Sequence, residues 1–102
     1  MGTLAEIVKR ELAWYASGGL NSKAILLSNE EARVYAVNVY DYPKHELPAG
    51  IAVMARLEGE YIVIEEDRTT KPIEDRLMAA GIPRDRIILA YAGEKLPDTH
   101  QN

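Results

Sequence analysis

Residues 59–91 decide how this chain folds, and they read GEYIVIEEDRTTKPIEDRLMAAGIPRDRIILAY. The run from Tyr61 to Ile64 is β-branched and aromatic. Gly59 precedes this run and acidic residues follow it, which is typical of a strand with a buried face. A polar turn, a helical pattern and a second apolar run, Ile87 to Tyr91, come next. Links this short allow the two strands to pair in parallel across the helix. The stretch therefore predicts a strand, helix and strand unit that supplies much of the core.

The helix of this unit is predicted to span Pro72 to Ala80. Proline lacks an N–H group that the first helical turn would leave unpaired, so Pro72 suits the start. The preceding turn carries side-chain oxygens that can accept backbone N–H bonds at the helix start, from Asp67, Thr69 and Thr70. Gly81 follows the helix and is expected to take a positive φ, while Pro83 prevents the helix from continuing.

The N-terminal segment predicts a second, amphipathic helix. Thr3 and Glu6 match a capping box. Helical spacing places one set of apolar side chains on a common face, namely Leu4, Ile7, Val8, Leu12 and Tyr15. Glu11 is expected largely opposite this face and Trp14 close to its edge, and the pair Gly18-Gly19 is expected to end the helix. Such a one-faced helix needs a sheet or another helix to cover it.

Three further strand patterns lie between the two helices, at residues 23–27, 33–40 and 51–57, and residues 41–50 read as a surface loop. Together with Tyr61 to Glu66 they make two consecutive hairpins. The order predicts an α+β fold with an N-terminal helix, two β-hairpins, a helix and a final strand. Both helices are expected to pack on one mixed, mostly antiparallel sheet.

Length and composition fit one compact domain over residues 1–102, with an ordered core at about 3–92 and a polar tail at 93–102. The net charge of -4 disfavours direct binding to nucleic acid. The sequence has no cysteine, and no apolar run reaches the roughly 18 residues that a membrane helix needs. We therefore expect a cytoplasmic protein without a disulfide, and nothing in the sequence predicts a cofactor.

The stretch from Ala80 to Tyr91, with Tyr61 to Glu65 and with Asp67 and Thr69, resembles the C-terminal half of the XisI-like proteins. This family is named for an fdxN-element excision controlling factor of cyanobacteria, and Ala-Gly-Ile-Pro-Arg-Asp is the most specific part of the match. The resemblance implies an XisI-like fold and a role as an accessory or control protein of a mobile-element excision system. It also implies a protein partner, an XisH-like companion that resembles nucleases.

Four carboxylates are the strongest candidates for a metal or acid/base cluster, namely Asp41, Glu65, Glu66 and Asp67. Successive strand residues point to opposite faces, so Glu65 and Glu66 do not easily converge on one ion. A solvated strand end is the interpretation we prefer. His45 and His100 have no serine or cysteine motif near them. The residues therefore predict neither a catalytic group nor a metal ligand.

The sequence thus favours a non-catalytic control protein that binds a protein partner. Trp14, Tyr40 and Tyr42 are its candidate anchors, and Glu65 and Glu66 are candidate rim charges. Two alternatives remain open, a metal-dependent enzyme that uses the turn Glu65 to Asp67 and a direct DNA-binding excision factor. Tyrosines on the outer face of the sheet, with Asn38 among them, also predict a two-fold homodimer.

Overall fold

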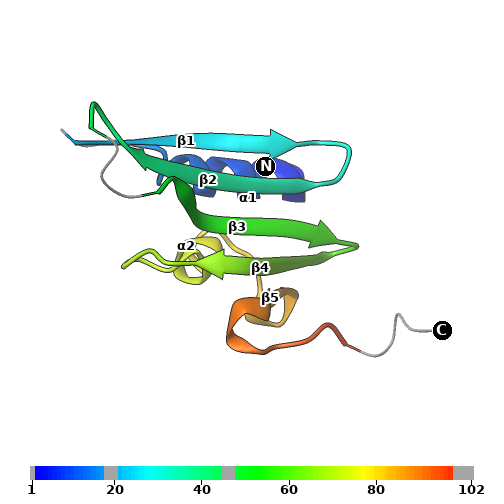
Figure 1. The fold of residues 1–102 in the computed structure, drawn as a ribbon. Coiled ribbons are helices and arrows are strands. Elements are labelled where there is room, and N and C mark those ends of the chain that lie inside the picture. Colours follow the sequence, from blue (N-terminus) through cyan, green and yellow to red (C-terminus); the bar gives the residue numbers. More distant parts are fainter. Residues whose placement is uncertain (1, 18–20, 45–47, 98–102) are drawn as a thin grey trace.

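A computed structural model of the chain describes residues 2–17, 21–44 and 48–97. These residues form two α-helices and a five-stranded sheet, arranged as in Figure 1. The elements in chain order are α1 (Leu4–Ala13), β1 (Ser22–Asn29), β2 (Val34–Asp41), β3 (Gly50–Glu58), β4 (Tyr61–Asp67), α2 (Ile73–Ala79) and β5 (Ile87–Leu89), with short 3-10 turns at Arg84–Arg86 and Ala90–Ala92. His45, His100 and the pair Gly18-Gly19 lie outside the described residues.

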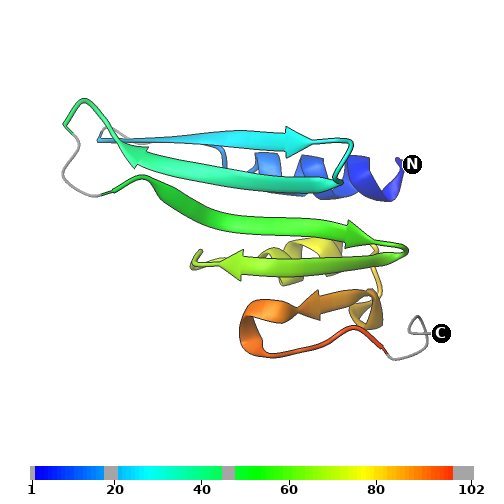
Figure 2. The same cartoon turned by 45° about the vertical axis from the view of Figure 1, so that its right-hand side comes forward.

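The strands follow one another across the sheet in the order β1-β2-β3-β4-β5. The first three neighbouring pairs are antiparallel, and β4 and β5 are parallel, with Val63 opposite Ile88. Both helices lie on the same face of this sheet, α1 behind β1 and β2 and α2 behind β3 and β4 (Figures 1 and 2). The predicted α+β fold is confirmed, including its mixed sheet and its parallel last pair.

The core lies between the helices and the covered face of the sheet. The side chains of Val8 and Leu12 on α1 and of Ile73 and Leu77 on α2 are fully buried there. Alternate residues of the central strands complete the same cluster, namely Tyr35, Val37, Val53, Ala55, Leu57, Ile62 and Ile64. Alternation along each strand leaves the other side chains on the opposite face, which no helix of the described residues covers.

Helix α1 begins as its sequence predicts, because Thr3 and Glu6 form the expected capping box. The predicted end at the glycine pair is wrong, since α1 ends at Ala13 and Trp14 is its C-cap. The expectation for Glu11 is also wrong. Its side chain is buried rather than opposite the core, because α2 packs beside α1 and widens the buried face of this helix. None of the described helices is both long and apolar enough to cross a membrane.

Helix α2 is one residue shorter at each end than predicted, running from Ile73 to Ala79 with Pro72 as its N-cap. Its C-terminal end is a Schellman motif. The N–H of Ile82 donates to the carbonyl of Leu77 and the N–H of Gly81 to that of Met78, both at 3.0 Å. Gly81 has a φ of 103°, which confirms the predicted left-handed residue.

Strand β5 is shorter than predicted. It ends at Leu89, and Ala90–Ala92 form a 3-10 turn instead of continuing to Tyr91. Backbone hydrogen bonding explains the early end, since the N–H of Glu94 donates to the carbonyl of Leu89 at 3.0 Å. This bond draws the chain back toward the strand rather than along it.

Candidate functional site

The half-exposed indole of Trp14 lies at the end of α1, where the sequence had placed a candidate anchor. Trp14 is the one tryptophan of the chain, and 47% of its surface is exposed. The guanidinium carbon of Arg76 on α2 lies 4.1 Å from the centre of the Trp14 ring, a stacked cation–π contact. Tyr15 contacts the indole edge-on, with ring centres 5.1 Å apart. The anchor is therefore already ordered by its neighbours.

Glu11 connects the two helices beneath this ring. Its carboxylate, on a residue only 9% exposed, contacts Arg76 Nη2 at 3.0 Å and Arg10 Nε at 3.2 Å. Two cations thus satisfy one buried anion, as burial of a charge requires. Among the described residues, Arg76 Nε is buried without a hydrogen-bond partner. The Trp14 ring lies against the guanidinium that carries this atom.

These residues line an open groove of about 720 Å³ between α1 and α2, which we call the Trp14 groove. Its lining comes from the end of α1 and from the turn and helix after β4, namely Arg10, Glu11, Trp14, Thr70, Lys71, Pro72, Asp75, Arg76, Ala79 and Ala80. The Lys71 ammonium lies 5.7 Å from the Trp14 ring centre. The groove combines an aromatic surface with cations, in a chain whose net charge is negative.

The turn after β4 is held by Asp67. One carboxylate oxygen accepts the N–H and the hydroxyl of Thr69 at 2.9 and 2.6 Å, and the other accepts the N–H of Ile73 at 2.8 Å. The second contact caps α2 from six residues upstream. The hydroxyl of Tyr15 donates to the carbonyl of Lys71 and links this turn to α1. Burial, and then the nearby Asp67 carboxylate, raise the pKa of Tyr15, so its hydroxyl remains a donor to a higher pH than an ordinary phenol does.

The acidic run at the end of β4 does not converge on one point. Glu65 contacts Arg56 Nε at 2.6 Å, and Glu66 contacts Arg68 Nε at 3.3 Å. Asp67 is occupied by the turn. Within the described part of the chain, no group of three histidine, aspartate or glutamate residues could hold a metal ion. The arrangement offers separate ion pairs and a cap rather than a cation site.

The predicted anchors Tyr40 and Tyr42 do not share the groove of Trp14. Tyr42 is 50% exposed and lines a separate cavity of about 380 Å³ with Asn21, Asp41, Pro43 and Lys44. Lys23 lies over the Tyr42 ring, 5.0 Å from its centre. Tyr40 is partly buried opposite Lys23 in the β1–β2 pair. The structure therefore separates the three aromatic residues into two regions.

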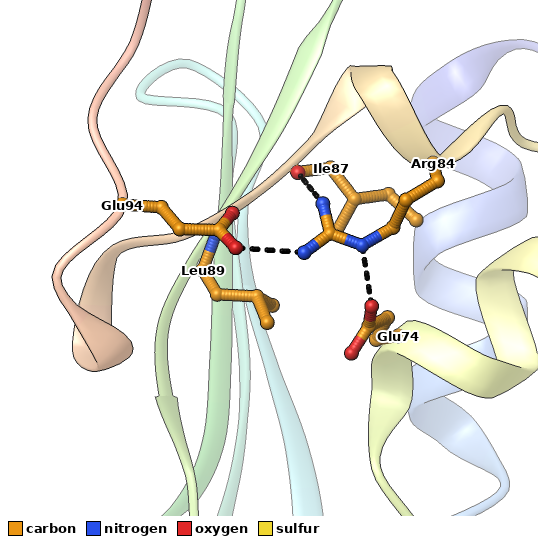
Figure 3. Close-up of polar contacts among 5 residues, drawn as sticks. All are labelled: Glu74, Arg84, Ile87, Leu89 and Glu94. Carbon is orange, nitrogen blue, oxygen red and sulfur yellow. Dashed lines mark hydrogen bonds and ion pairs between the residues drawn. The ribbon is translucent and has the colours of Figure 1, made fainter.

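Arg84, Ile87 and Leu89, which lie in the stretch that carries the family resemblance, are joined to Glu74 and Glu94, which lie outside it, as Figure 3 shows. Arg84 donates from Nη1 to the carbonyl of Ile87 at 2.7 Å and from Nη2 to Glu94 at 2.7 Å, and its Nε contacts Glu74 at 2.5 Å. The second Glu94 oxygen accepts the N–H of Leu89 at 2.9 Å. We call this set the Arg84 clasp. It joins α2, β5 and the segment after it.

Sequence reasoning missed the contributions of Glu11, Lys71 and Arg76 to the groove and of Glu94 to the clasp. A glutamate three residues before the tryptophan, on a helix with a wide apolar face, was the one available signal for Glu11. Nothing local marks Arg76 as its partner, because the contact depends on how the two helices pack.

Comparison with known proteins gives the family of the chain. Residues 3–100 match the family described as XisI protein. The structure is similar to the crystal structure of an XisI-like protein from Anabaena variabilis, with 20% identity, a TM-score of 0.74, and coverage of 95% of this chain and 89% of that chain. It is also similar to the fdxN element excision controlling factor XisI from Anabaena variabilis, with 27% identity, a TM-score of 0.61, and coverage of 87% and 80%. A search of curated proteins found no match. From the match over residues 3–100, the chain belongs to the XisI family.

Proposed function

We propose that this protein is a non-catalytic control protein that works by binding a protein partner, such as an XisH-like companion, through the Trp14 groove. One of its structural neighbours is an excision controlling factor, which favours a regulatory role. The observation that carries the proposal is the Trp14 indole, 47% exposed yet fixed by the Arg76 guanidinium at 4.1 Å. Tryptophan and arginine are the residues most enriched among those that dominate binding energy.

An ordered anchor is favourable for association because little side-chain freedom remains to be lost on binding. Arg76 is held on its other side by Glu11, so the stacked pair does not need to form when a partner arrives. The Lys71 ammonium beside the ring can meet a carboxylate of the partner. The net charge of -4 complements the basic surface expected of a partner that itself binds nucleic acid.

The charges of the described residues support this role over direct DNA binding. Most cations that the structure describes are already engaged by carboxylates of the same chain, namely Lys9, Arg10, Arg56, Arg68, Arg76, Arg84 and Arg86. A cation paired in this way must give up its carboxylate before it replaces a counterion on a phosphate backbone, so its contribution to DNA binding is reduced. The carboxylates at the end of β4 are engaged as well, which disfavours the metal-dependent enzyme.

The test is to co-express the chain with an XisH-like protein and to measure the dissociation constant by calorimetry. We expect Trp14→Ala to weaken binding at least about tenfold, since a tenfold change is about 1.4 kcal/mol and anchors of this type contribute about 2 kcal/mol or more. Tyr42→Ala is the matched control, because Tyr42 is similarly exposed but lines another cavity. Binding should also weaken as salt rises. An unchanged dissociation constant for a folded Trp14→Ala protein would remove the groove from the interface.

A second experiment tests the absence of catalysis. The chain alone is incubated with DNA and Mg²⁺ or Mn²⁺, and we expect neither cleavage nor tight binding. Cleavage that is lost in the Glu65→Gln, Glu66→Gln double variant would overturn the proposal in favour of the metal-dependent enzyme. Tight DNA binding without a partner would instead favour a direct excision factor.

A further inference from the structure

The two edges of the sheet differ in how their backbone groups are used. On the outer side of β5, the N–H and the carbonyl of Leu89 bond to Glu94, and the carbonyl of Ile87 accepts from Arg84. The strand is only three residues long. The Arg84 clasp therefore occupies this edge, and no further strand can pair there without displacing it.

The opposite edge, β1, is long and open. Tyr42 N–H donates to the carbonyl of Asn21 at 3.1 Å, and the β1–β2 register continues without a shift, so the odd-numbered residues of β1 bond to β2. The backbone groups of Ala24, Leu26 and Ser28 consequently point away from the sheet. None of the backbone hydrogen bonds that the described turns, loops and caps make involves these groups.

Strand β1 also has few of the features that keep an edge from pairing. It has no proline, and the irregularities of the sheet lie in the β2–β3 and β3–β4 pairs instead. Lys23 is its one charged residue. Ile25 and Leu27 are 43% and 44% exposed on the face that no described helix covers. An exposed apolar edge of this length is a template for another strand.

We propose that the occupant of this edge is a second copy of the chain, whose β1 pairs antiparallel with the first about a two-fold axis at Leu26. Opposed residues in such a pair share a face, so Leu26 meets Leu26 of the second copy and Ala24 meets Ser28. The symmetry gives three such pairs, Ala24 with Ser28, Leu26 with Leu26 and Ser28 with Ala24. Each pair exchanges two backbone hydrogen bonds, about six in all. The two five-stranded sheets would become one continuous sheet.

The side chains of β1 fit this self-pairing. On the uncovered face, Ile25 of one copy lies opposite Leu27 of the other, so exposed apolar side chains meet each other. Lys23 lies opposite the uncharged Asn29, which avoids the like-charge contact that a lysine-on-lysine register would produce. The side chains of two β1 strands therefore pair without charge repulsion, although each whole chain carries a net charge of -4.

The helices leave room for the second copy. Helix α1 packs across β1, β2 and β3, so its axis lies over β2. In the paired sheet the two β2 strands are three strand spacings apart, about 14 Å. Packed helices need only about 8–10 Å between their axes. The two copies of α1 therefore do not collide across the two-fold axis.

The first test combines mass with amide exchange on the isolated chain. Light scattering at tens of micromolar should give twice the mass of the 11.4 kDa chain. By NMR, the amides of Ala24, Leu26 and Ser28 should exchange at least about tenfold more slowly at high than at low protein concentration. A monomer mass overturns the proposal. Protection of these amides only after an XisH-like partner is added would assign the edge to that partner instead.

Variants of β1 test the geometry. Ser28→Pro removes an outward N–H from an exposed side-chain position and should give a monomer, whereas Ser28→Thr, which keeps the N–H, should remain a dimer. A charge pair keeps the test decisive if the proline variant does not fold. Ile25→Lys with Leu27→Lys should raise the dimer dissociation constant at least about tenfold relative to Ile25→Glu with Leu27→Lys. Equal constants for the two double variants would overturn the proposed register.

Discussion

The two halves of this protein use their side chains in different ways. In the C-terminal unit, residues 59–94, the turn, the helix end and the last strand are held by internal contacts from Asp67, Gly81 and Arg84. Among the described residues, the N-terminal half, residues 3–58, has more large apolar or aromatic side chains that are nearly half exposed, namely Trp14, Ile25, Leu27 and Tyr42, against Met78 and Tyr91 in the C-terminal unit. The comparison teaches that the segment carrying the most specific family resemblance builds the architecture. The N-terminal half supplies the exposed indole of Trp14 and the open edge of β1, although most of the other residues that line the Trp14 groove belong to the C-terminal unit.

The largest expected effect is loss of core packing between α2 and the sheet. Leu77→Ala empties a fully buried site and should lower the free energy of unfolding by about 2–5 kcal/mol. Met78→Ala is the matched control, because Met78 is the next residue on α2 and is 44% exposed. Urea unfolding followed by circular dichroism measures both. If the two variants lost similar stability, the C-terminal unit would not be organised around this core.

Gly81 gives the next effect. At a φ of 103° any side chain is strained, so Gly81→Ala should cost about 1 kcal/mol. The cost should not be much larger, because a Cβ built on Gly81 meets no atom within 4 Å. Gly50→Ala, which also meets no atom within 4 Å, is the control and should change stability little. An unchanged melting temperature for Gly81→Ala would show that a side chain at this position is not strained.

Acid should weaken the Arg84 clasp. The hydrogen bond from Arg84, and then that from the Leu89 N–H, hold the pKa of Glu94 below its ordinary value of 4.5. A lowered folded-state pKa means that the contribution is present above pH 4.5 and is lost as pH falls through the lowered value. Glu94→Gln should therefore flatten the decline in melting temperature below pH 4.5. Glu31→Gln, which removes a carboxylate from the exposed β1–β2 loop, should leave the decline unchanged.

The smallest effect is expected in the N-terminal half, at Arg33 in the loop between β1 and β2. Arg33 has a φ of 56°, a left-handed conformation that glycine adopts without strain. Arg33→Gly relieves this strain but makes the unfolded chain more flexible, so the two terms offset and stability should change by less than about 0.5 kcal/mol. A loss comparable to that of Gly81→Ala would show that the Arg33 side chain contributes contacts of its own.

Most of the fold could be predicted because its signals are local. The capping box of α1, the alternation in β2 and β4, and the proline and glycine around α2 each act within a few residues. The end of β5 could not be predicted, because Ala90 and Tyr91 have the composition of a strand and the chain turns for a bond that Glu94 makes. The helix α1 was predicted too long because residues 14–17 have a composition that a helix tolerates, whereas Tyr15 and Ala16 make turn hydrogen bonds to Leu12 and Ala13 instead.

The candidate site was predicted only in part. Trp14 was recognised from its place on the helix and its residue type, but its stacking on Arg76 depends on packing between two helices far apart in the sequence. Tyr40 and Tyr42 were grouped with it by composition alone, and the structure places them in another region. The separate roles of Glu65 and Glu66 did follow from strand alternation, which is again a local property.

The Arg84 clasp limits how many copies of the chain can join one continuous sheet. A sheet that is open at both edges can add copies without limit, and the product is a fibre. Here Glu94 and Arg84 cover the backbone of β5, so a copy that joins through β1 presents only covered edges to solution. The proposed self-association through β1 would therefore close at two chains. Shortening the protein before Glu94 would uncover a second edge and turn a finite pair into an open-ended array.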